Sequence, residues 1–386
     1  MLGCACQGPQ DLVIATNWTA AECVHLERDF RNRTGANIIW VRLDPWEDPM
    51  RRLDHRLAAD VVLGGPPESY RALANEGRIE ASWRIARNAP IGLGVVEAAL
   101  RERAILLPND WRALADPRFE GLVALDDPRH APATLAWMRA RLAAGRWAEG
   151  YAELVRAASR ARPIGRRGGA AEADLRRGEA GASPIAGKRA DLPVLTLPGG
   201  GTWTEGVAMT TQARNPALAE EFLRAFPAPA SGQAEADPRA IGLLADLLGA
   251  ALVEAQQELW AARDALAKAG RPAHLEMLLT QAPPWPPASI EKMDRSADPD
   301  VLKEKLAELI APEEELRAWL LRSWKRPKRP IDGRFLDELA AVGEGRLVDH
   351  PRFRAWLRGE WTAWCRQSYR RVARRAQEQA VKEGTS

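Results

Sequence analysis

Residues 11–41 read DLVIATNWTAAECVHLERDFRNRTGANIIWV, and this stretch indicates the type of fold. The apolar run at 12–15 predicts a buried strand, and the polar turn after it contains Thr19, a residue type that often caps a helix. The helix predicted to run through Phe30 ends at Gly35, and residues 37–41 predict a second strand. A strand, a helix and a strand at this spacing predict a parallel α/β sheet.

The alternation of strands and helices continues along the chain. A third strand is predicted at 60–63, followed by a turn at Gly64-Gly65 and a helix that ends at Gly77. Residues 88–96 are apolar with two glycines, and we expect them to cross to a second lobe. The further elements expected are helices at 46–58, 108–116, 134–160 and 216–226 and strands at 121–125 and 207–209.

The pattern changes after residues 227–232, where Pro, Ala and Gly form the clearest linker of the chain. Apolar residues from Ile241 to Leu259 recur at helical spacing, and no strand is predicted beyond the linker. Further helices are expected at about 300–310, 312–324, 333–342 and 351–378. The C-terminal region is therefore predicted to be all-α.

Composition limits the class of protein. The 386 residues predict two or three domains, and 46% hydrophobic with 28% charged residues is typical of a globular chain. The net charge of +3 is uneven, because residues 317–375 hold 16 Lys and Arg against six Asp and Glu. No run approaches 18 consecutive apolar residues, so no membrane span is expected.

The cysteines and histidines do not form a recognisable metal or disulfide pattern. The four Cys stand at positions 4, 6, 23 and 365 without a CxxC pair, and the five His show no HExxH spacing. A nucleophile elbow, a P-loop and a GxGxxG turn are also missing from the sequence. We therefore expect neither a cofactor nor a metal, and a binding protein rather than an enzyme.

The N-terminus resembles the end of a bacterial lipoprotein signal. Leu2, Gly3 and Cys4 match the leucine, small residue and cysteine that mark the lipidation point, although no basic segment and apolar core precede them. Our hypothesis is that the true start lies upstream and that Cys4 becomes the lipidated first residue. The alternative is a cytosolic protein in which this Gly-Cys pair is accidental. The genomic sequence upstream of Met1 distinguishes the two.

Four segments together resemble the bacterial extracellular solute-binding proteins of ABC importers, which have the two-lobed type II periplasmic binding fold. In the order typical of that family, they are LVIATNWTAAECVHLERDFRNRTGANI (12–38), ADVVLGGPPESYRALANEG (59–77), PNDWRALADPRFEGLVALDDP (108–128) and GVAMTTQARNPALAEEFLRAF (206–226). The resemblance implies this fold class, α/β, with an all-α C-terminal extension.

The resemblance also implies a division into lobes. Residues 1–10 are interpreted as a signal remnant and linker, 11–100 as the first part of lobe 1, and 101–200 as lobe 2. The chain is then expected to return to lobe 1 at 201–232. Residues 233–386 form the α-helical C-terminal region, which we expect to complete lobe 1 in part.

Ligands of open α/β sheets bind beyond the carboxyl ends of strands, so the resemblance assigns candidate ligand-binding residues there. The candidates are Thr16, Asn17, Trp18, Gly64, Gly65, Asp127, Thr134, Trp203, Thr204 and Glu205. The alternative roles are ordinary ones. Thr16 would cap a helix, Trp18 would fill the core, the glycines would serve only their turn, and Glu205 would be an exposed carboxylate.

The sequence departs from the family pattern in two places. Only Thr134 remains of the small Ser-Gly-Thr turn that many relatives use for anions, so an anionic ligand is in doubt. Tyr70, Tyr151 and Tyr369 stand far apart, which disfavours the clustered tyrosines of ferric-ion relatives. A small organic cation, a sugar-like compound and an organic acid remain open as the solute.

The function predicted from these features is capture of a small solute in the cleft between the lobes and delivery to an ABC importer permease. We expect a monomer in the periplasm or cell envelope that binds no nucleic acid. The Trp-rich, basic tail suggests contact with a membrane surface, although a solvated helix face is the common alternative. The competing interpretation is a cytosolic enzyme or nucleic-acid-associated protein with the same lobes.

Overall fold

The computed structural model describes residues 11–43, 58–144, 147–187, 189, 191–227, 238–283 and 351–384. These residues form two compact units. The first lobe lies within residues 1–90, 167–169 and 202–238, and the second within 91–166, 170–201 and 239–386. The helix expected at 46–58 falls almost wholly outside the described residues, as do Cys4, most of the linker and the helices expected between 300 and 342.

The first lobe is built on a mixed sheet that begins with the predicted parallel strands. β1 (Leu12–Thr16) pairs in parallel with β2 (Ile38–Arg42) and with β3 (Val61–Leu63). β7 (Thr202–Met209) runs antiparallel to β3, and residues 84–90 of β4 (Arg84–Val95) run antiparallel to β7. The strand expected at 207–209 is therefore the last part of a longer one.

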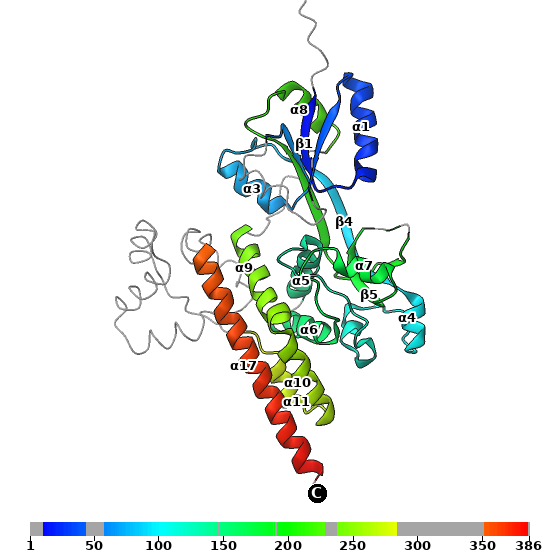
Figure 1. Cartoon of the computed structure of the whole chain (residues 1–386), viewed down its shortest axis with the longest axis vertical. Helices are drawn as coiled ribbons and strands as arrows, with labels where there is room; N and C mark the ends of the chain where they lie inside the picture. Colours follow the sequence, from blue (N-terminus) through cyan, green and yellow to red (C-terminus); the bar gives the residue numbers. More distant parts are fainter. Residues whose placement is uncertain are drawn as a thin grey trace, which may run out of the picture. The chain divides into compact units, whose positions relative to one another are not determined.

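Helices cover both faces of this sheet (Figure 1). On one face α1 (Ala20–Thr34) and α8 (Pro216–Leu223) bring Phe30 and Phe222 edge to face, 5.8 Å apart, over the apolar side chains of β1 and β3. On the other face α3 (Pro67–Asn75) packs Tyr70 against Val62. Neighbouring residues of one strand thus serve opposite faces, as a doubly covered sheet requires.

The second lobe starts where β4 leaves β7. Residues 91–95 of β4 pair with β5 (Ala182–Ala186) and β6 (Val194–Leu195). The boundary between the lobes in β4 thus falls at Pro90, ten residues before the expected one. The surrounding elements are α4 (Glu97–Glu102), η1 (Trp111–Ala115), η2 (Pro117–Phe119), α5 (Pro132–Ala144), α6 (Trp147–Arg160) and α7 (Ala170–Arg176).

Two predictions for this lobe need correction. The segment expected as a strand at 121–125 forms only single bridges, from Val123 to Ala161 and Ala182. The long helix expected at 134–160 is two helices, α5 and α6, which pack against each other. A Cβ at Gly150 would lie 2.6 Å from the Arg141 carbonyl oxygen, so glycine permits this close approach.

The C-terminal region is helical throughout its described part, and these helices belong to the second lobe. α9 (Pro238–Leu248), the π-helical η3 (Gly249–Glu254) and α10 (Gln256–Lys268) follow one another, and α11 (Ala273–Leu279) comes next. The long α17 (Pro351–Gly384) lies along α10 (Figure 1). No described helix combines the length and the apolar composition needed to cross a bilayer.

Buried contacts attach these helices to the second lobe. The Gln256 side chain accepts the backbone N–H of Ile164 and donates to the carbonyl of Arg162. Arg263 donates to the carbonyl of Ser159 over 2.7 Å. From the sequence we expected part of this region to complete lobe 1, whereas its described helices make these contacts with lobe 2.

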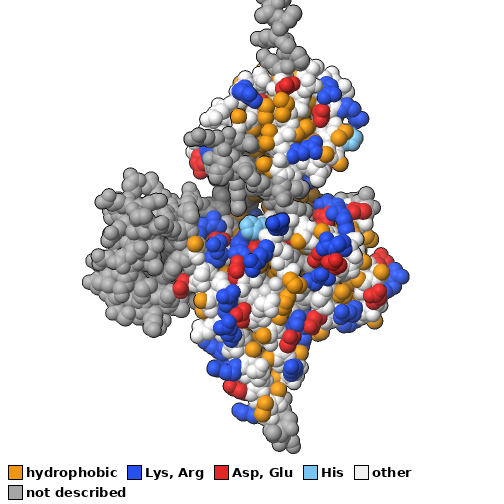
Figure 2. Space-filling view, in the orientation of Figure 1, with side chains coloured by type: hydrophobic (Ala, Val, Ile, Leu, Met, Phe, Trp, Pro, Cys, Tyr) orange, Lys and Arg blue, Asp and Glu red, His pale blue; other side chains and the backbone are white. Residues whose placement is uncertain are grey.

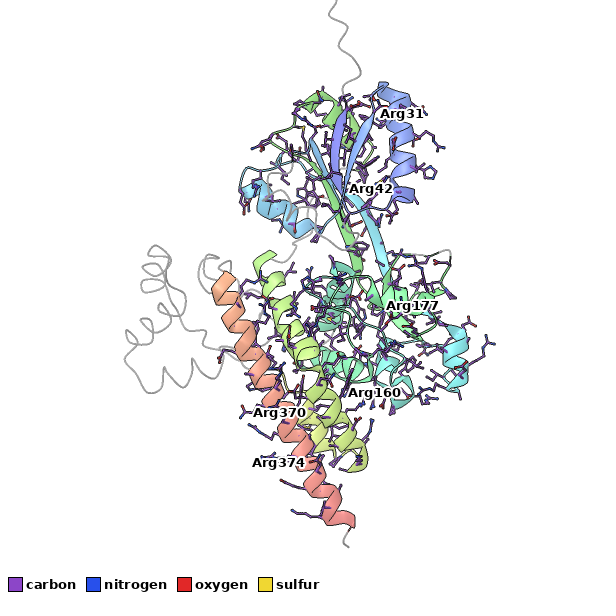
Figure 3. The ribbon with its side chains drawn as sticks, in the orientation of Figure 1. Arg31, Arg42, Arg160, Arg177, Arg370 and Arg374 are labelled. Atoms are coloured by element: carbon purple, nitrogen blue, oxygen red, sulfur yellow. The ribbon has the colours of Figure 1, made fainter. Side chains whose placement is uncertain are left out.

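α17 buries one stripe of side chains and exposes a basic one. Its buried stripe is Leu357, Trp361, Cys365, Tyr369, Val372 and Ala376. Arg370 and Arg374 point outward (Figure 3), and Arg370 pairs with Glu258 of α10 at 2.7 Å. Figure 2 shows acidic and basic side chains interspersed on the visible face of this region. Among the tryptophans of the tail, Trp361 is buried in this stripe and Trp364 is half-buried, whereas Trp319, Trp324 and the Trp356 side chain lie outside the described part.

Candidate functional site

The candidate site of the first lobe lies at the carboxyl ends of two adjacent parallel strands. Asn17 and Trp18 follow β1, and Gly64 and Gly65 follow β3. β7 runs antiparallel to β3 with Val207 opposite Leu63, so Glu205 extends past the same end of β3. The strand order brings together five of the predicted residues.

Trp18, Arg87 and Glu205 form the centre of the site, and we call them the first-lobe cluster. The indole N–H of Trp18 donates to Oε2 of Glu205 over 3.0 Å. Arg87 Nε lies 3.3 Å from the same oxygen, and the guanidinium carbon stands 4.2 Å from the centre of the Trp18 ring. Arg87 and Glu205 are also direct partners in the register of β4 and β7. The cluster thus joins an ion pair to a cation–π contact.

Glu205 is a buried carboxylate with unused hydrogen-bonding capacity. Its side chain is 1% exposed, and Oε1 has no hydrogen-bond partner among the described residues. Burial raises the pKa of Glu205 to about 7, although the charge of Arg87 and the Trp18 hydrogen bond act in the opposite direction. A buried acceptor without a partner is costly, and sites that bind ligands retain such groups. The sequence-based alternative of an exposed loop carboxylate is wrong.

The N-terminal cap of α1 positions Arg87. Thr19 Oγ1 accepts the backbone N–H of Glu22, and Glu22 Oε2 accepts the backbone N–H of Thr19, which completes a capping box. The other oxygen of Glu22, Oε1, accepts a hydrogen bond from Arg87 over 2.7 Å. Glu22 therefore caps the helix and orients the guanidinium that covers Trp18.

Asn17 and Gly64 are fitted to each other. Gly64 has φ = 97°, and a Cβ there would lie 2.0 Å from Oδ1 of Asn17. This oxygen is buried and has no partner among the described residues. The Tyr70 hydroxyl lies 2.5 Å from the Gly64 carbonyl oxygen and 2.7 Å from the Gly206 carbonyl oxygen, and it stabilises the turn through these contacts. Glycine at 64 is required by the turn and by the Asn17 side chain.

Alternation along β7 separates the three predicted residues of that strand. Trp203 and Glu205 share one side of the strand, and the Arg87 guanidinium lies 5.7 Å from the Trp203 ring. Trp203 is buried, and its indole N–H has no described partner. Thr204 is on the other side, where its hydroxyl donates to Oδ1 of Asn88 over 3.1 Å. Thr204 is therefore not part of the cluster. Thr16 is buried, and its hydroxyl oxygen accepts a hydrogen bond from the backbone N–H of Trp18 over 3.0 Å.

The two predicted residues of the second lobe are buried. Asp127 is 1% exposed, and its carboxylate accepts three hydrogen bonds from Arg129, through the backbone N–H, Nε and Nη2. Arg129 also pairs with Glu254 of η3 at 2.9 Å. Asp127 thus belongs to a network that attaches the C-terminal helices. Thr134 is buried in the first turn of α5.

The tyrosines that stand far apart in the sequence do not all stay apart in the fold. Tyr151 of α6 and Tyr369 of α17 come together beside Cys365, and all three are buried. Burial is the main cause that raises the pKa of both phenols well above their usual value, and it raises that of the Cys365 thiol to about 12. The premise that these two tyrosines are distant was wrong.

Arg87, Glu22 and Tyr70 are site residues that sequence reasoning missed. Arg87 stands in the stretch that leads to the crossing segment, and its relation to Glu205 depends on the strand register. The register is irregular between Ile85 and Arg87, so alternation from the apolar part of β4 would have misplaced the arginine. The Thr19–Glu22 spacing of a capping box was the one signal available in the sequence.

Comparison with known proteins places this architecture in a class. The model of the family described as bacterial extracellular solute-binding protein matches residues 13–234, more than half of the chain. The chain belongs to this family, and its fold is the two-lobed type II periplasmic binding protein fold with a C-terminal helical extension, as expected. No curated protein sequence matches the chain significantly.

Solved structures with a similar course of the chain are periplasmic binding proteins. The periplasmic binding protein P5PA has a TM-score of 0.48 at 18% identity, over 55% of this chain and 78% of its own. AfuA from Actinobacillus pleuropneumoniae, solved with fructose-6-phosphate, has a TM-score of 0.48 at 17% identity, over 55% and 77%. A periplasmic thiamin binding protein has a TM-score of 0.47 at 15% identity, over 62% and 81%.

Proposed function

We propose that the protein is an extracytoplasmic solute receptor that captures a small molecule and delivers it to an ABC importer permease. Membership of the solute-binding family supports this function over the alternatives of an enzyme or a nucleic-acid-associated protein. The observation that carries the proposal is the first-lobe cluster with the adjacent Trp203, where two indoles, a guanidinium and a buried carboxylate gather beyond the strand ends.

Two of the three groups left without described partners favour a solute that donates hydrogen bonds. Glu205 Oε1 and Asn17 Oδ1 are acceptors, so hydroxyl or amino groups would satisfy them, and the third group, the Trp203 indole N–H, is a donor that a hydroxyl oxygen would satisfy. Arg87 is already shared between Glu22 and Glu205, which leaves little of it for an organic acid. Indole faces suit sugar rings and organic cations. We therefore favour a sugar-like compound or a small organic cation.

The part played by the second lobe stays a prediction. Closure of the two lobes on the solute is the expected mode of capture, with Asp127 and Thr134 as the expected contributions of lobe 2. Arg129 occupies the Asp127 carboxylate, which leaves the Thr134 hydroxyl as the expected contact of lobe 2 with the solute. Thr134→Val tests this role, since it removes the hydroxyl and keeps the shape of the side chain.

The experiment is a thermal-shift screen of the purified chain against sugars, polyamines, quaternary amines and organic acids, followed by titration of each hit. Binding of a ligand to the native state alone raises the melting temperature, and at a given concentration a tighter ligand raises it further. Trp18→Ala and Trp203→Ala should each weaken a genuine hit about tenfold or more. Trp40→Ala is the matched control, because this indole of the same lobe pairs with Glu27 and packs on Phe222.

The result that would contradict the proposal is a chain that folds normally but shows no shift with any small solute. A hit that Trp40→Ala weakens as much as Trp18→Ala would place the binding elsewhere in the lobe.

We further propose attachment to the cell envelope through lipid on Cys4, with the basic face of α17 at the membrane surface. Cys4 lies outside the described residues, so support comes from its sequence context. Sedimentation with anionic vesicles tests the tail, and Arg370→Gln/Arg374→Gln, which removes two exposed charges of α17, should bind less than the wild-type chain. Equal binding by both chains would reject the tail contact.

A further inference from the structure

The second lobe contains a pocket that is separate from the first-lobe cluster. It has a volume of about 100 Å³, several times what one water molecule needs. Elements distant in sequence meet there, namely η1, α6, α10 and α11. The lining residues include four arginines, and we call it the arginine pocket: Arg156, Arg160, Arg263 and Arg271, with Ser159 and Glu276.

Arg160 is the most deeply placed of the four. Its side chain is 5% exposed, and it lies at the end of α6 (Figure 3). The Nε–H is buried and has no hydrogen-bond partner among the described residues. One nitrogen, Nη1, approaches the half-exposed Glu120 at 3.4 Å. Arg160 therefore retains donor capacity inside a pocket that it lines.

The neighbouring charges do not neutralise this guanidinium. Arg263 takes the other oxygen of Glu120 at 3.0 Å and also pairs with Asp264 at 2.6 Å, so Arg160 shares its one acidic partner with a second arginine. Arg271 approaches its acidic partner, Glu276, only to 3.9 Å. The pKa of Arg160 is lowered, first by burial and then by the charges of Arg271 and Arg263. The pocket is thus a region of positive potential.

The hydroxyls of the pocket are already bonded to backbone carbonyls, and its lining carboxylate, Glu276, stands beside Arg271. The hydroxyl of Ser159 gives its proton to the Arg156 carbonyl, and that of Thr280 lies 3.0 Å from the Glu276 carbonyl. The exposed Arg156 side chain has no ion pair within the described part of the chain. Guanidinium groups are therefore the groups left to recognise a ligand, and their planar forks match the oxygens of a phosphate group.

We infer that the arginine pocket binds a small phosphate-bearing solute. The phosphate oxygens would accept from Arg160 Nε, from the exposed guanidinium of Arg156 and from the partly exposed one of Arg271. The bound anion would join α6 to α10 and α11, and would thereby strengthen attachment of the C-terminal helices to the second lobe. This site is independent of the solute proposed for the first lobe.

The test is isothermal titration of the full chain with inorganic phosphate at pH 7.5, with chloride at equal ionic strength as the reference. The wild-type chain should bind one phosphate, and phosphate should raise its melting temperature. The double variant Arg156→Gln/Arg271→Gln removes two charge-assisted donors, and it should weaken phosphate binding about tenfold or more. Arg156→Gln alone is the milder variant, and its exposed side chain makes it safe for folding.

The matched control is Arg370→Gln/Arg374→Gln, which removes the same charge from exposed positions on α17 of the same lobe (Figure 3). It should leave phosphate affinity within about twofold, since surface charges act weakly at this ionic strength. Three results would overturn the proposal. They are no heat beyond the chloride reference, equal losses in both double variants, or a loss caused by Trp18→Ala instead.

Discussion

In the first lobe one guanidinium, Arg87, stands between two carboxylates, Glu22 and Glu205, whereas in the second lobe two guanidiniums, Arg160 and Arg263, meet at the carboxylate of Glu120. Arg263 has a further partner in Asp264. The first site leaves two buried acceptors and the indole N–H of Trp203 without described partners, whereas the second leaves a guanidinium N–H without one. The same residue types thus prepare sites for different ligands. The unsatisfied group indicates which ligand each site suits.

The difference extends to how each site is held. The first-lobe cluster depends on strand register and one helix cap, so it is built by backbone pairing. The arginine pocket exists because the C-terminal helices pack on α6 and are tied there by side-chain bonds. Substitutions of Arg263 or Gln256 should therefore affect the second site alone, and substitutions in the turns after β1 and β3 should affect the first.

Breaking the buried ion pair of the second lobe should have the largest effect. Arg129→Met leaves the Asp127 carboxylate, 1% exposed, without its partner and removes the link to Glu254. We expect a loss of about 3–5 kcal/mol in the free energy of unfolding, because an unpaired buried charge is strongly destabilising. Urea unfolding followed by fluorescence of the buried Trp111 and Trp137 measures this loss.

The chain supplies a matched control for this variant. Asp116-Pro117-Arg118 repeats the Asp-Pro-Arg sequence of 127–129, with the same hydrogen bond from the arginine N–H to the aspartate. Arg118 is 56% exposed, so Arg118→Met should leave the free energy of unfolding almost unchanged. Equal losses in the two variants would mean that burial of Asp127 contributes nothing.

The pH dependence of the first-lobe cluster should be the next largest effect. The folded protein holds the Glu205 proton up to about pH 7, while the unfolded chain releases it near the ordinary glutamate pKa of 4.5. The folded state therefore binds more protons in this window, and stability falls as pH rises from about 4.5 to 7. Glu205→Gln should abolish up to about 3 kcal/mol of that fall.

The contribution of Glu22 to stability should change with pH in the opposite direction. The backbone bond to Thr19 and the charge of Arg87 overcome its burial and lower its pKa, so its contribution is present above the unfolded pKa and lost as pH falls. Glu22→Gln should thus lose stability at neutral pH and little at acid pH. Unfolding curves between pH 4 and 8 distinguish the variants. Parallel pH profiles for wild type and Glu205→Gln would show that Glu205 titrates normally.

Much of the fold could be predicted because local patterns and packing agree. Thr19 and Gly35 mark the ends of α1 in both sequence and structure, and the apolar runs at 12–15 and 61–63 are strands. The segment around Val123 could not be predicted in the same way. Its apolar residues are buried but find only single bridging partners, and periodicity does not report pairing.

The candidate site was predictable only in part, for a related reason. Trp18 and Gly64 follow strand ends, which the sequence marks, so their position at the carboxyl edge was foreseeable. Arg87 reaches Glu205 across more than a hundred residues through the register of β4 and β7. The Arg129 side chain that occupies the Asp127 carboxylate likewise pairs with Glu254 of a distant helix. Contacts of this kind follow from tertiary packing and not from local pattern.

The turn beneath Asn17 should be more sensitive than an open turn of the same lobe. Gly64→Ala places a methyl group at φ = 97° and 2.0 Å from Asn17 Oδ1, so we expect a loss of about 2–3 kcal/mol. Gly35→Ala is the control, since φ is 72° there and no atom lies within 4 Å of the added carbon. It should cost about 1 kcal/mol. Thermal unfolding measures the loss of stability in both variants. Equal losses would show that the Asn17 side chain does not restrict residue 64.

The helix cap should give the smallest effect that is still measurable. Thr19→Ala removes the hydroxyl that accepts the Glu22 N–H, and we expect a loss of about 1 kcal/mol. Because Glu22 also orients Arg87, the same variant should weaken binding of any solute that the first lobe takes. Thr204→Ala removes a hydroxyl on the other side of β7, bonded to Asn88, and should change stability by less than about 0.5 kcal/mol. If Thr204→Ala weakened solute binding more than Thr19→Ala, the solute would lie on the opposite side of β7 from Glu205.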